Sequence, residues 1–240
     1  MDQLDLLGHE FSRIPWENLT KYLRKLEVPP GRERMRGPLE VFEDHARLGT
    51  GGTCFSLTEA LGSTLRDLGF RCRVAMADMS HGRDIHCVLL VRMEEGLFVI
   101  DPGYLVPVPV ELRRDRRTGA NAFGRRYEYD PVEGGWNMYT TEAGVRTWRY
   151  LLKSRPVDGA EFERHWLRSF EATSMNGLHI NRLDSRGRSY VHNHKMRLVD
   201  VSGRSSNHNL REGYPVRVSA MFGIDEEVAS RAWDRLQESV

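Results

Sequence analysis

Cysteine is scarce in this sequence, and the few cysteines present do not form a recognised pattern. Three occur among the 240 residues, Cys54, Cys72 and Cys87, without CxxC spacing. An odd number without such spacing argues against a disulfide framework and against a closed structural zinc site. We therefore expect free thiols, a reducing cytoplasmic location and no bound metal.

The sequence also lacks a basic leader, long apolar runs and an excess of charge. Acidic residues stand in MDQLDLLGHEF where a signal peptide carries basic ones, and no apolar run approaches the roughly 18 residues of a membrane span. The 35 Lys and Arg residues nearly balance the 34 Asp and Glu residues. This balance argues against partners such as nucleic acid or acidic membranes. With 40% hydrophobic residues, the chain can bury a substantial core.

Helical periodicity dominates the first third of the chain. Residues 17–28 carry apolar side chains at i, i+3, i+4 and i+7, which predicts a half-buried helix. A second helix is predicted over 38–49, because Pro38 suits a first helical turn and Gly49 suits a helix end. A third helix begins near Cys54 and ends before a glycine at residue 69.

After Phe70 the period changes to two, which predicts strands. The expected strands cover 71–79, 86–92, 96–101, 104–112, 125–130, 136–142 and 145–152. A helix over 158–171, strands over 177–184 and 189–201, and a helix over 225–237 complete the prediction. The fold class is therefore α+β, with a helical first third, a mostly β middle and a mixed end, divided near Phe70 and Val157.

The motif GGTC brings a cysteine to the start of a predicted helix. A thiol acts as a nucleophile only as the thiolate, and the positive end of a helix lowers a thiol pKa. Gly51 and Gly52 allow a sharp turn and a close substrate approach, and the free N–H groups of the first helical turn suit an oxyanion. Cys54 is therefore a candidate nucleophile.

His86 and Asp101 are candidate partners for this cysteine. His86 opens the apolar run HCVLLV, and Asp101 ends the run LFVID. If the two runs pair as an antiparallel hairpin, both side chains lie at one sheet edge, where the carboxylate would orient the imidazole. Each residue also has a structural interpretation: a buried small thiol, a strand histidine and a turn former. The three together favour a catalytic triad.

Several segments resemble the arylamine N-acetyltransferase family, whose pattern is close to PFENL, RGGxCFE, LGF, HxxLLV and VDVGFG. The matching segments, in the same order, are IPWENL (14–19), GGTCF (51–55), LGF (68–70), HCVLLV (86–91) and VIDPGY (99–104). The chain departs from this pattern at Thr50, Ser56 and Thr58, where the family has Arg, Glu and commonly Asn, and at Pro102 and Tyr104.

The resemblance implies a three-domain fold and a reaction. The expected domains are a helical bundle over 1–70 carrying Cys54, a β-barrel over 71–157 carrying His86 and Asp101, and an α/β lid over 158–240. The implied reaction is ping-pong transfer of acetyl from acetyl-CoA, the co-substrate, through a thioester on the triad cysteine to an arylamine or hydrazine.

The acceptor and CoA sites have weaker candidates. Phe55 and Tyr104 are candidates for the wall of an acyl-acceptor pocket, with a core packing role as the alternative. The arginines of ELRRDRRTGANAFGRR (111–126) could meet CoA phosphates, or form a solvated loop. The oligomeric state is not predicted.

Other classes of protein use similar residues. Transglutaminase-like and peptidase-like enzymes also place a cysteine on a helix before His and Asp on strands, but they attack amide carbonyls. An amide synthase that accepts another thioester, and a non-catalytic binding protein, are further alternatives. The HNH motif at residues 192–194 would put two imidazoles on one strand face, where a surface role is expected rather than a metal site.

Overall fold

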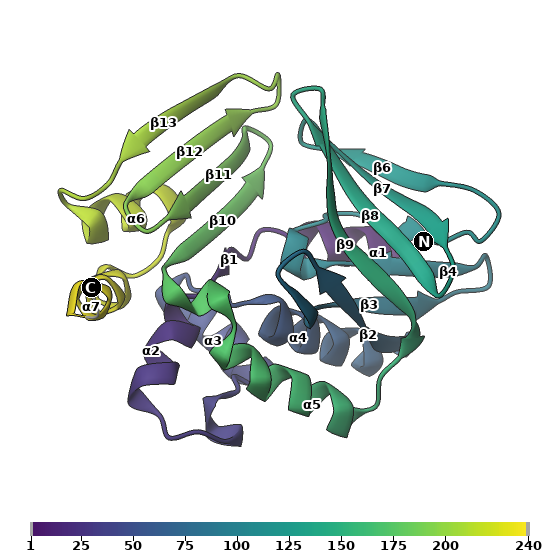
Figure 1. Cartoon of the computed structure of the whole chain (residues 1–240), viewed down its shortest axis with the longest axis horizontal. Helices are drawn as coiled ribbons and strands as arrows, with labels where there is room; N and C mark the ends of the chain where they lie inside the picture. Colours follow the sequence, from purple (N-terminus) through teal and green to yellow (C-terminus); the bar gives the residue numbers. More distant parts are fainter. Residues whose placement is uncertain (1, 239–240) are drawn as a thin grey trace.

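The computed structural model describes residues 2–238 and contains two antiparallel sheets with helices beneath and beside them (Figure 1). The first helices precede most of the strands along the chain, and a short strand lies among them. Their bounds are α1 Asp2–Phe11, β1 Trp16–Glu17, α2 Leu19–Glu27, η1 Arg32–Arg34, α3 Pro38–Leu48 and α4 Cys54–Asp67. The predicted helices over 17–28, 38–49 and 54–68 are confirmed, whereas α1 was not predicted.

The larger sheet has eight strands in the order β5-β4-β3-β2-β9-β8-β7-β6 and curls into a nearly closed barrel. Its members are β2 Arg71–Met79, β3 Gly82–Arg92, β4 Leu97–Ile100, β5 Val110–Glu111, β6 Thr118–Ala122, β7 Arg125–Val132, β8 Gly135–Glu142 and β9 Val145–Pro156; the 3-10 turn η2 Pro102–Tyr104 follows β4. Side chains that alternate inward fill the barrel, including Tyr127, Tyr129 and Tyr150.

The smaller sheet joins the two ends of the chain. Its order is β1-β10-β11-β12-β13, so the N-terminal strand β1 pairs with a strand from the C-terminal part. The elements after the barrel are α5 Gly159–Arg168, η3 Ser169–Glu171, η4 Thr173–Asn176, β10 His179–Asp184, β11 Gly187–His192, β12 Lys195–Asp200, β13 Ser205–Asn209, α6 Tyr214–Phe222 and α7 Glu226–Glu238. Helices α6 and α7 pack against this sheet.

Helix α4 lies at the centre of the molecule because its apolar face packs against the barrel. Leu57, Leu61 and Leu65 are buried and share a core cluster with Leu89 and Val91 of β3. Burying one such leucine contributes roughly 1.5–3 kcal/mol. The first residue of α4 is therefore held at the junction of helices and barrel.

The α+β fold class is confirmed, but several individual predictions are wrong. The segment 104–112 forms mainly turns, and only Val110–Glu111 is strand, because Pro107 and Pro109 cannot donate to a strand ladder. The predicted strand over 189–201 is two strands, β11 and β12, with Asn193 at positive φ in the turn between them. The strand β13 and the helix α6 were not predicted. The domain limits at residues 70 and 157 remain a prediction.

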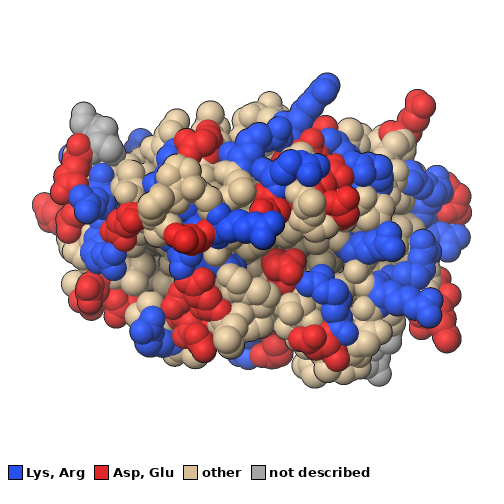
Figure 2. Space-filling model, turned by 90° about the horizontal axis from the view of Figure 1, so that it is seen from below, with Lys and Arg blue, Asp and Glu red and all other residues tan. Residues whose placement is uncertain are grey.

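Charged side chains of both signs occur together on one face of the molecule. Acidic and basic side chains are mixed over the face seen in Figure 2, in agreement with the net charge of +1. Among residues 2–238, no helix is both long enough and apolar enough to cross a membrane.

Candidate active site

Cys54 is the first residue of α4 and follows directly from the glycine turn. Gly51 is required there, because a Cβ at this position would lie 1.7 Å from the carbonyl oxygen of Pro15. The turn is tied to β1 by a 3.0 Å hydrogen bond from the N–H of Glu17 to the carbonyl of Gly52. The helix start is thus fixed by close backbone packing, and the Cys54 side chain is buried at the edge of a cavity.

His86 and Asp101 are in direct contact. The Nε2 atom of His86 lies 3.1 and 3.0 Å from the two carboxylate oxygens of Asp101, and both residues are buried. The predicted antiparallel pairing of the two runs is observed, with Leu89 opposite Ile100. His86 does not open its strand as expected, because β3 already begins at Gly82.

Asp101 accepts two further hydrogen bonds that the sequence analysis missed. The Tyr150 hydroxyl donates to one carboxylate oxygen at 2.5 Å, and the backbone N–H of Tyr104 donates to the other at 3.0 Å. The Tyr129 and Tyr150 hydroxyls are 2.9 Å apart. The carboxylate is therefore held from three sides. The inward tyrosines of β7 and β9 were the sequence signal for this network.

Gly103 occupies the narrow space between the cysteine and the histidine. A Cβ on Gly103 would lie 2.6 Å from the Cβ of Cys54 and 2.7 Å from the Cε1 of His86. Only a glycine allows the η2 backbone to pass this close. Because Nε2 of His86 is engaged by Asp101, Nδ1 is the ring nitrogen left for the thiol side.

The electrostatics of the site favour a charged sulfur. A hydrogen bond from the Cys87 thiol lowers the pKa of Cys54 most; burial opposes this effect, while the hydrogen bond and charge of His86 and the charge of Lys21 add to it, leaving the pKa well below the usual range. Burial alone would lower the pKa of His86, but the charge and hydrogen bond of Asp101, together with Cys54, raise it to about 10. The two shifts favour a thiolate beside an imidazolium at neutral pH.

Lys21 is a second unpredicted member of the site. Its ammonium group is buried, donates to the Ser169 hydroxyl at 2.5 Å and lies 4.6 and 5.6 Å from the ring centres of Phe170 and Phe55. No carboxylate oxygen within the described part of the chain is within 4.0 Å of it. Burial lowers the pKa of Lys21 to about 8. No periodicity or motif distinguished this lysine from the other polar residues of its helix.

Arg36 supports the glycine turn from the opposite side. Its buried guanidinium donates to the carbonyl of Gly51 at 2.7 Å, to the Thr20 hydroxyl at 2.9 Å and to Asp44 at 2.8 Å. The sequence departs from the family pattern at Thr50, which is also buried. A guanidinium from outside the motif therefore supplies polar contacts at the start of α4.

A cavity of about 460 Å³ opens beside Cys54 and His86. Phe55 and Tyr104 both line this cavity. Phe55 also stacks on Phe162 with ring centres 5.6 Å apart, so it combines lining and packing. The walls come from the helices, the barrel and the smaller sheet, through Trp16, Lys21, Thr53, Met79, His81, Ile85, Gly103, Arg125, Arg149, Ser169, Ala172, Ser174, His179, Asn181, Arg188 and Tyr190.

Most of the remaining candidates lie away from the cavity. His192 ends β11 and His194 lies in the following turn, so the two imidazoles do not share a strand face as expected. His192 instead stacks on His179 with ring centres 4.4 Å apart. In the segment 111–126, most arginines pair with carboxylates or pack on Trp136, and one of them, Arg125, lines the cavity. No group of three His, Cys, Asp or Glu side chains arranged for a metal occurs among residues 2–238.

Comparison with known proteins confirms the resemblance. A family model described as N-acetyltransferase matches residues 2–217. The chain therefore belongs to the arylamine N-acetyltransferase family, which identifies the protein as an acetyltransferase. No curated protein matches the sequence.

Solved structures share the fold at low sequence identity. Arylamine N-acetyltransferase from Mycobacterium tuberculosis superposes with a TM-score of 0.82 at 18% identity, covering 100% of this chain and 93% of that one. The Mycobacterium marinum enzyme in complex with CoA gives 0.81 at 19% identity, with 99% and 92% coverage. The Salmonella typhimurium enzyme gives 0.74 at 18% identity, with 92% and 86% coverage. The chain is a divergent member of the family.

Proposed function

We propose that the protein transfers an acetyl group from acetyl-CoA, through a thioester on Cys54, to an arylamine or hydrazine acceptor. The observation that carries this proposal is the position of Cys54 and His86 at the cavity wall, with His86 held at 3.0 Å by the buried Asp101. Support for acetyl-CoA as the donor comes from the family match and from the related M. marinum enzyme, which was solved with CoA.

In the first half-reaction the Cys54 thiolate attacks the thioester carbonyl of acetyl-CoA. The resulting oxyanion is stabilised by N–H groups in the first turn of α4, where the Thr53 side chain forms no capping bond. The carbon–sulfur bond to CoA then breaks. The imidazolium of His86 gives its proton to the departing CoA sulfur, and the acetyl group remains on Cys54.

In the second half-reaction the amine attacks the acetyl thioester. Neutral His86 now takes the proton from the attacking nitrogen, and the Cys54 sulfur leaves as a thiolate beside the restored imidazolium. The Asp101 carboxylate orients His86 and stabilises its imidazolium form in both halves. Phe55 and Tyr104 provide aromatic surface in the cavity for the ring of an arylamine.

The family match favours this function over a transglutaminase-like or peptidase-like enzyme. Those enzymes acylate their cysteine from an amide carbonyl, whereas an acetyltransferase acylates its cysteine from a thioester. An amide synthase that uses a different thioester shares the first chemical step, so the choice of donor separates it from an acetyltransferase.

Initial-rate kinetics test the proposal. Rates measured against acetyl-CoA at several concentrations of an arylamine should give parallel reciprocal plots, and about one equivalent of CoA should be released before any amine is added. Cys54→Ala should abolish both. Cys72→Ala, which changes another cysteine of the same helix–barrel core, should retain both. Intersecting plots, or no CoA release without amine, would contradict the thioester.

A further inference from the structure

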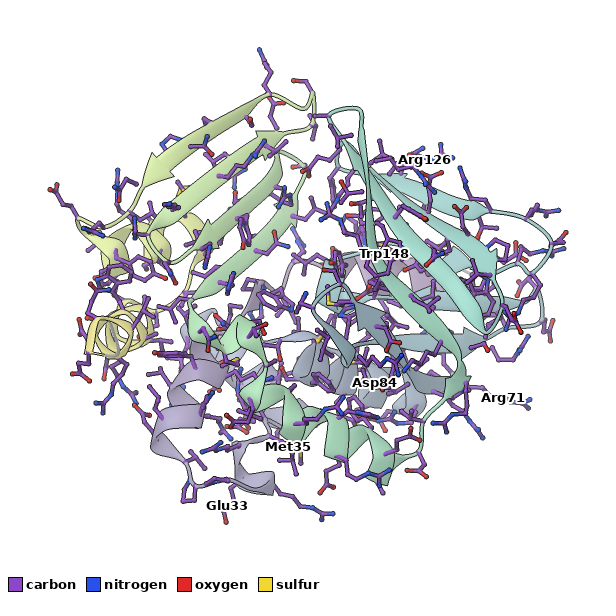
Figure 3. All side chains as sticks on the ribbon, viewed as in Figure 1. Glu33, Met35, Arg71, Asp84, Arg126 and Trp148 are labelled. Atoms are coloured by element: carbon purple, nitrogen blue, oxygen red, sulfur yellow. The ribbon has the colours of Figure 1, made fainter. Side chains whose placement is uncertain are left out.

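A second group of cations lies at the other end of the barrel from the candidate active site. Arg71 and Arg73 are the first and third residues of β2, Arg92 is the last residue of β3, and all three are exposed. Six residues along β3 separate Arg92 from His86, a span of about 20 Å at about 3.3 Å per residue. Figure 3 shows Arg71 at a barrel end well away from the smaller sheet. These arginines therefore belong to a surface apart from Cys54.

The three side chains occupy inward-facing positions of their strands. Ala75 of β2 and Leu90 of β3 belong to the barrel core, and Arg73 and Arg92 lie two residues from them on the same strands. Side chains two residues apart share one face of a strand. The inward rows of the barrel therefore change from apolar residues to arginine at this end.

The strand register brings two of these charges together. Arg71 is the direct partner of Arg92 in the antiparallel ladder of β2 and β3, and Arg73 is paired with Leu90 beside them. Residues directly opposite each other have Cβ atoms about 4.5–5.5 Å apart, and like charges in this position destabilise a sheet. An anion bound between the two guanidinium groups would remove this repulsion.

No acidic side chain neutralises the three arginines. Among residues 2–238, no carboxylate oxygen lies within 4.0 Å of any of their guanidinium groups. The acids of the adjacent surface are already paired, since Glu111 and Asp115 both bind Arg113. The N–H groups of the three arginines are therefore available to a ligand.

The arginines surround a cavity of about 490 Å³ with an apolar floor. The floor consists of Leu90, Leu97 and Pro156, and Leu90 is buried. Cys72 and Ser154 complete the lining, so no lining residue is acidic. A volume of this size suits a small molecule. The cavity thus combines positive charge at its rim with apolar surface beneath it.

We infer that this cavity binds an organic phosphate, with the phosphoryl group between Arg71 and Arg92 and the organic part on the apolar floor. Guanidinium groups donate parallel N–H bonds to phosphate oxygens. Two cations held close together favour a divalent anion over a monovalent one, because the divalent anion balances both charges. The site would take a ligand other than the two substrates of the proposed reaction.

Binding of phenyl phosphate, measured by calorimetry at pH 8 and constant ionic strength, tests the inference. At this pH phenyl phosphate is a dianion, whereas phenyl sulfate has a similar shape and a single charge, and inorganic phosphate lacks the ring. We expect phenyl phosphate to bind about tenfold more tightly than either of the others. Equal binding of phenyl sulfate would overturn the assignment to a phosphate. Equal binding of inorganic phosphate would overturn the role of the apolar floor.

Arginine variants locate the binding. Arg92→Gln and Arg71→Gln should each weaken binding of phenyl phosphate about tenfold, and Arg92→Lys, which keeps the charge but loses the planar fork, should weaken it less. Arg126→Gln is the matched control, because Arg126 is also an exposed arginine of the barrel and pairs with Glu128. Figure 3 shows Arg126 and Arg71 at widely separated positions. Binding that survives in both glutamine variants would overturn the inference.

Two further measurements separate this site from the cavity beside Cys54. Phenyl phosphate should leave the alkylation of Cys54 by iodoacetamide unchanged; protection of Cys54 that persists in Arg92→Gln would place the phosphate in the other cavity and overturn the inference. Arg92→Gln should also need no more acetyl-CoA than the wild type to acetylate Cys54. A higher requirement would assign these arginines to the phosphates of CoA and overturn a separate ligand. If no thioester acetylates Cys54, the proposed function fails and the calorimetric test still stands.

Discussion

Two groups of charged side chains near the cavity differ in how completely they are hydrogen-bonded. On one side, Asp101 accepts hydrogen bonds from His86, Tyr150 and a backbone N–H, and every one of these donors is fixed by a strand or turn. On the other side, Arg125 and Arg149 share a single hydroxyl acceptor. The hydrogen bonds of the first group are complete, whereas in the second group the Nε of Arg125 has no acceptor among residues 2–238.

This difference indicates different roles in catalysis. A satisfied buried network holds its members in one geometry, which suits groups that must move a proton over a short distance. Cations with spare N–H groups gain most from a ligand that supplies acceptors. The groups beside the sulfur are therefore held in one geometry by the protein itself. The guanidinium groups of Arg125 and Arg149 are instead available to the contents of the cavity.

The largest effect is expected from breaking the complete side. Asp101→Asn replaces one acceptor oxygen by an NH₂ group, which faces donors, and removes the charge that stabilises the imidazolium. We expect acetyl transfer to fall by about 10³-fold or more. Tyr150→Phe, which deletes one donor and keeps the carboxylate, should cost only about tenfold. Steady-state rates of acetyl transfer by both folded variants measure these effects. Near-normal activity of Asp101→Asn would show that Asp101 has no part in catalysis.

A smaller effect is expected for the state of the sulfur. Because the pKa of Cys54 is lowered, its alkylation by iodoacetamide should fall less between pH 8 and about pH 6 than that of an ordinary thiol, whose pKa is about 8.5. In His86→Ala the pKa of Cys54 should rise because the hydrogen bond and charge of His86 are lost, while the hydrogen bond from Cys87 remains and limits the rise. The alkylation rate at pH 7 should fall several-fold. Peptide mass spectrometry follows Cys54 apart from the other cysteines. Equal rates in both proteins would show that the two residues are not a pair.

The smallest effect is expected from replacing Lys21, which should raise the stability of the protein and lower the reactivity of Cys54. The pKa of Lys21 in the folded protein, about 8, lies below the ordinary lysine value of 10.5. Protonated Lys21 therefore destabilises the folded state fully below pH 8, and this cost disappears above about pH 10.5. Lys21→Met should therefore raise the free energy of unfolding by about 1–2 kcal/mol at pH 7, less than the shift alone implies because the bond to Ser169 is lost.

Denaturation in urea at pH 7 and at pH 10 measures this change. The gain should shrink at the higher pH, and Cys54 alkylation should slow a few-fold because a nearby positive charge is lost. Lys25→Met is a control on the same helix, since Lys25 pairs with Glu171 at the surface. A loss of stability in Lys21→Met would contradict the assignment of Lys21 as an uncompensated buried cation.

The sequence predicted the parts of the site that local patterns determine. The glycine turn and the helical period placed Cys54 at a helix start, and two apolar runs predicted the hairpin that joins His86 to Asp101. The predicted strand over 104–112 is wrong because its prolines cannot donate to a strand ladder. The single strand predicted over 189–201 is wrong because the turn at Asn193 contains no glycine that would signal it.

Residues that reach the site through tertiary contacts were not predictable from local patterns. Lys21 and Arg36 contact the site from elements far apart in sequence, and nothing in their neighbours marks them. Arg149 reaches the cavity through a β-bulge, which reverses the face that alternation assigns to it. The pairing of β1 with β10 likewise depends on the complete fold.

Intact-protein mass spectrometry after brief incubation with acetyl-CoA tests the central claim most directly. The wild type and Cys72→Ala should each gain the mass of one acetyl group, Cys54→Ala should gain none, and addition of an arylamine should remove the adduct. An adduct that persists in Cys54→Ala would contradict a thioester on Cys54. So would the absence of any adduct from a folded protein whose Cys54 still alkylates rapidly.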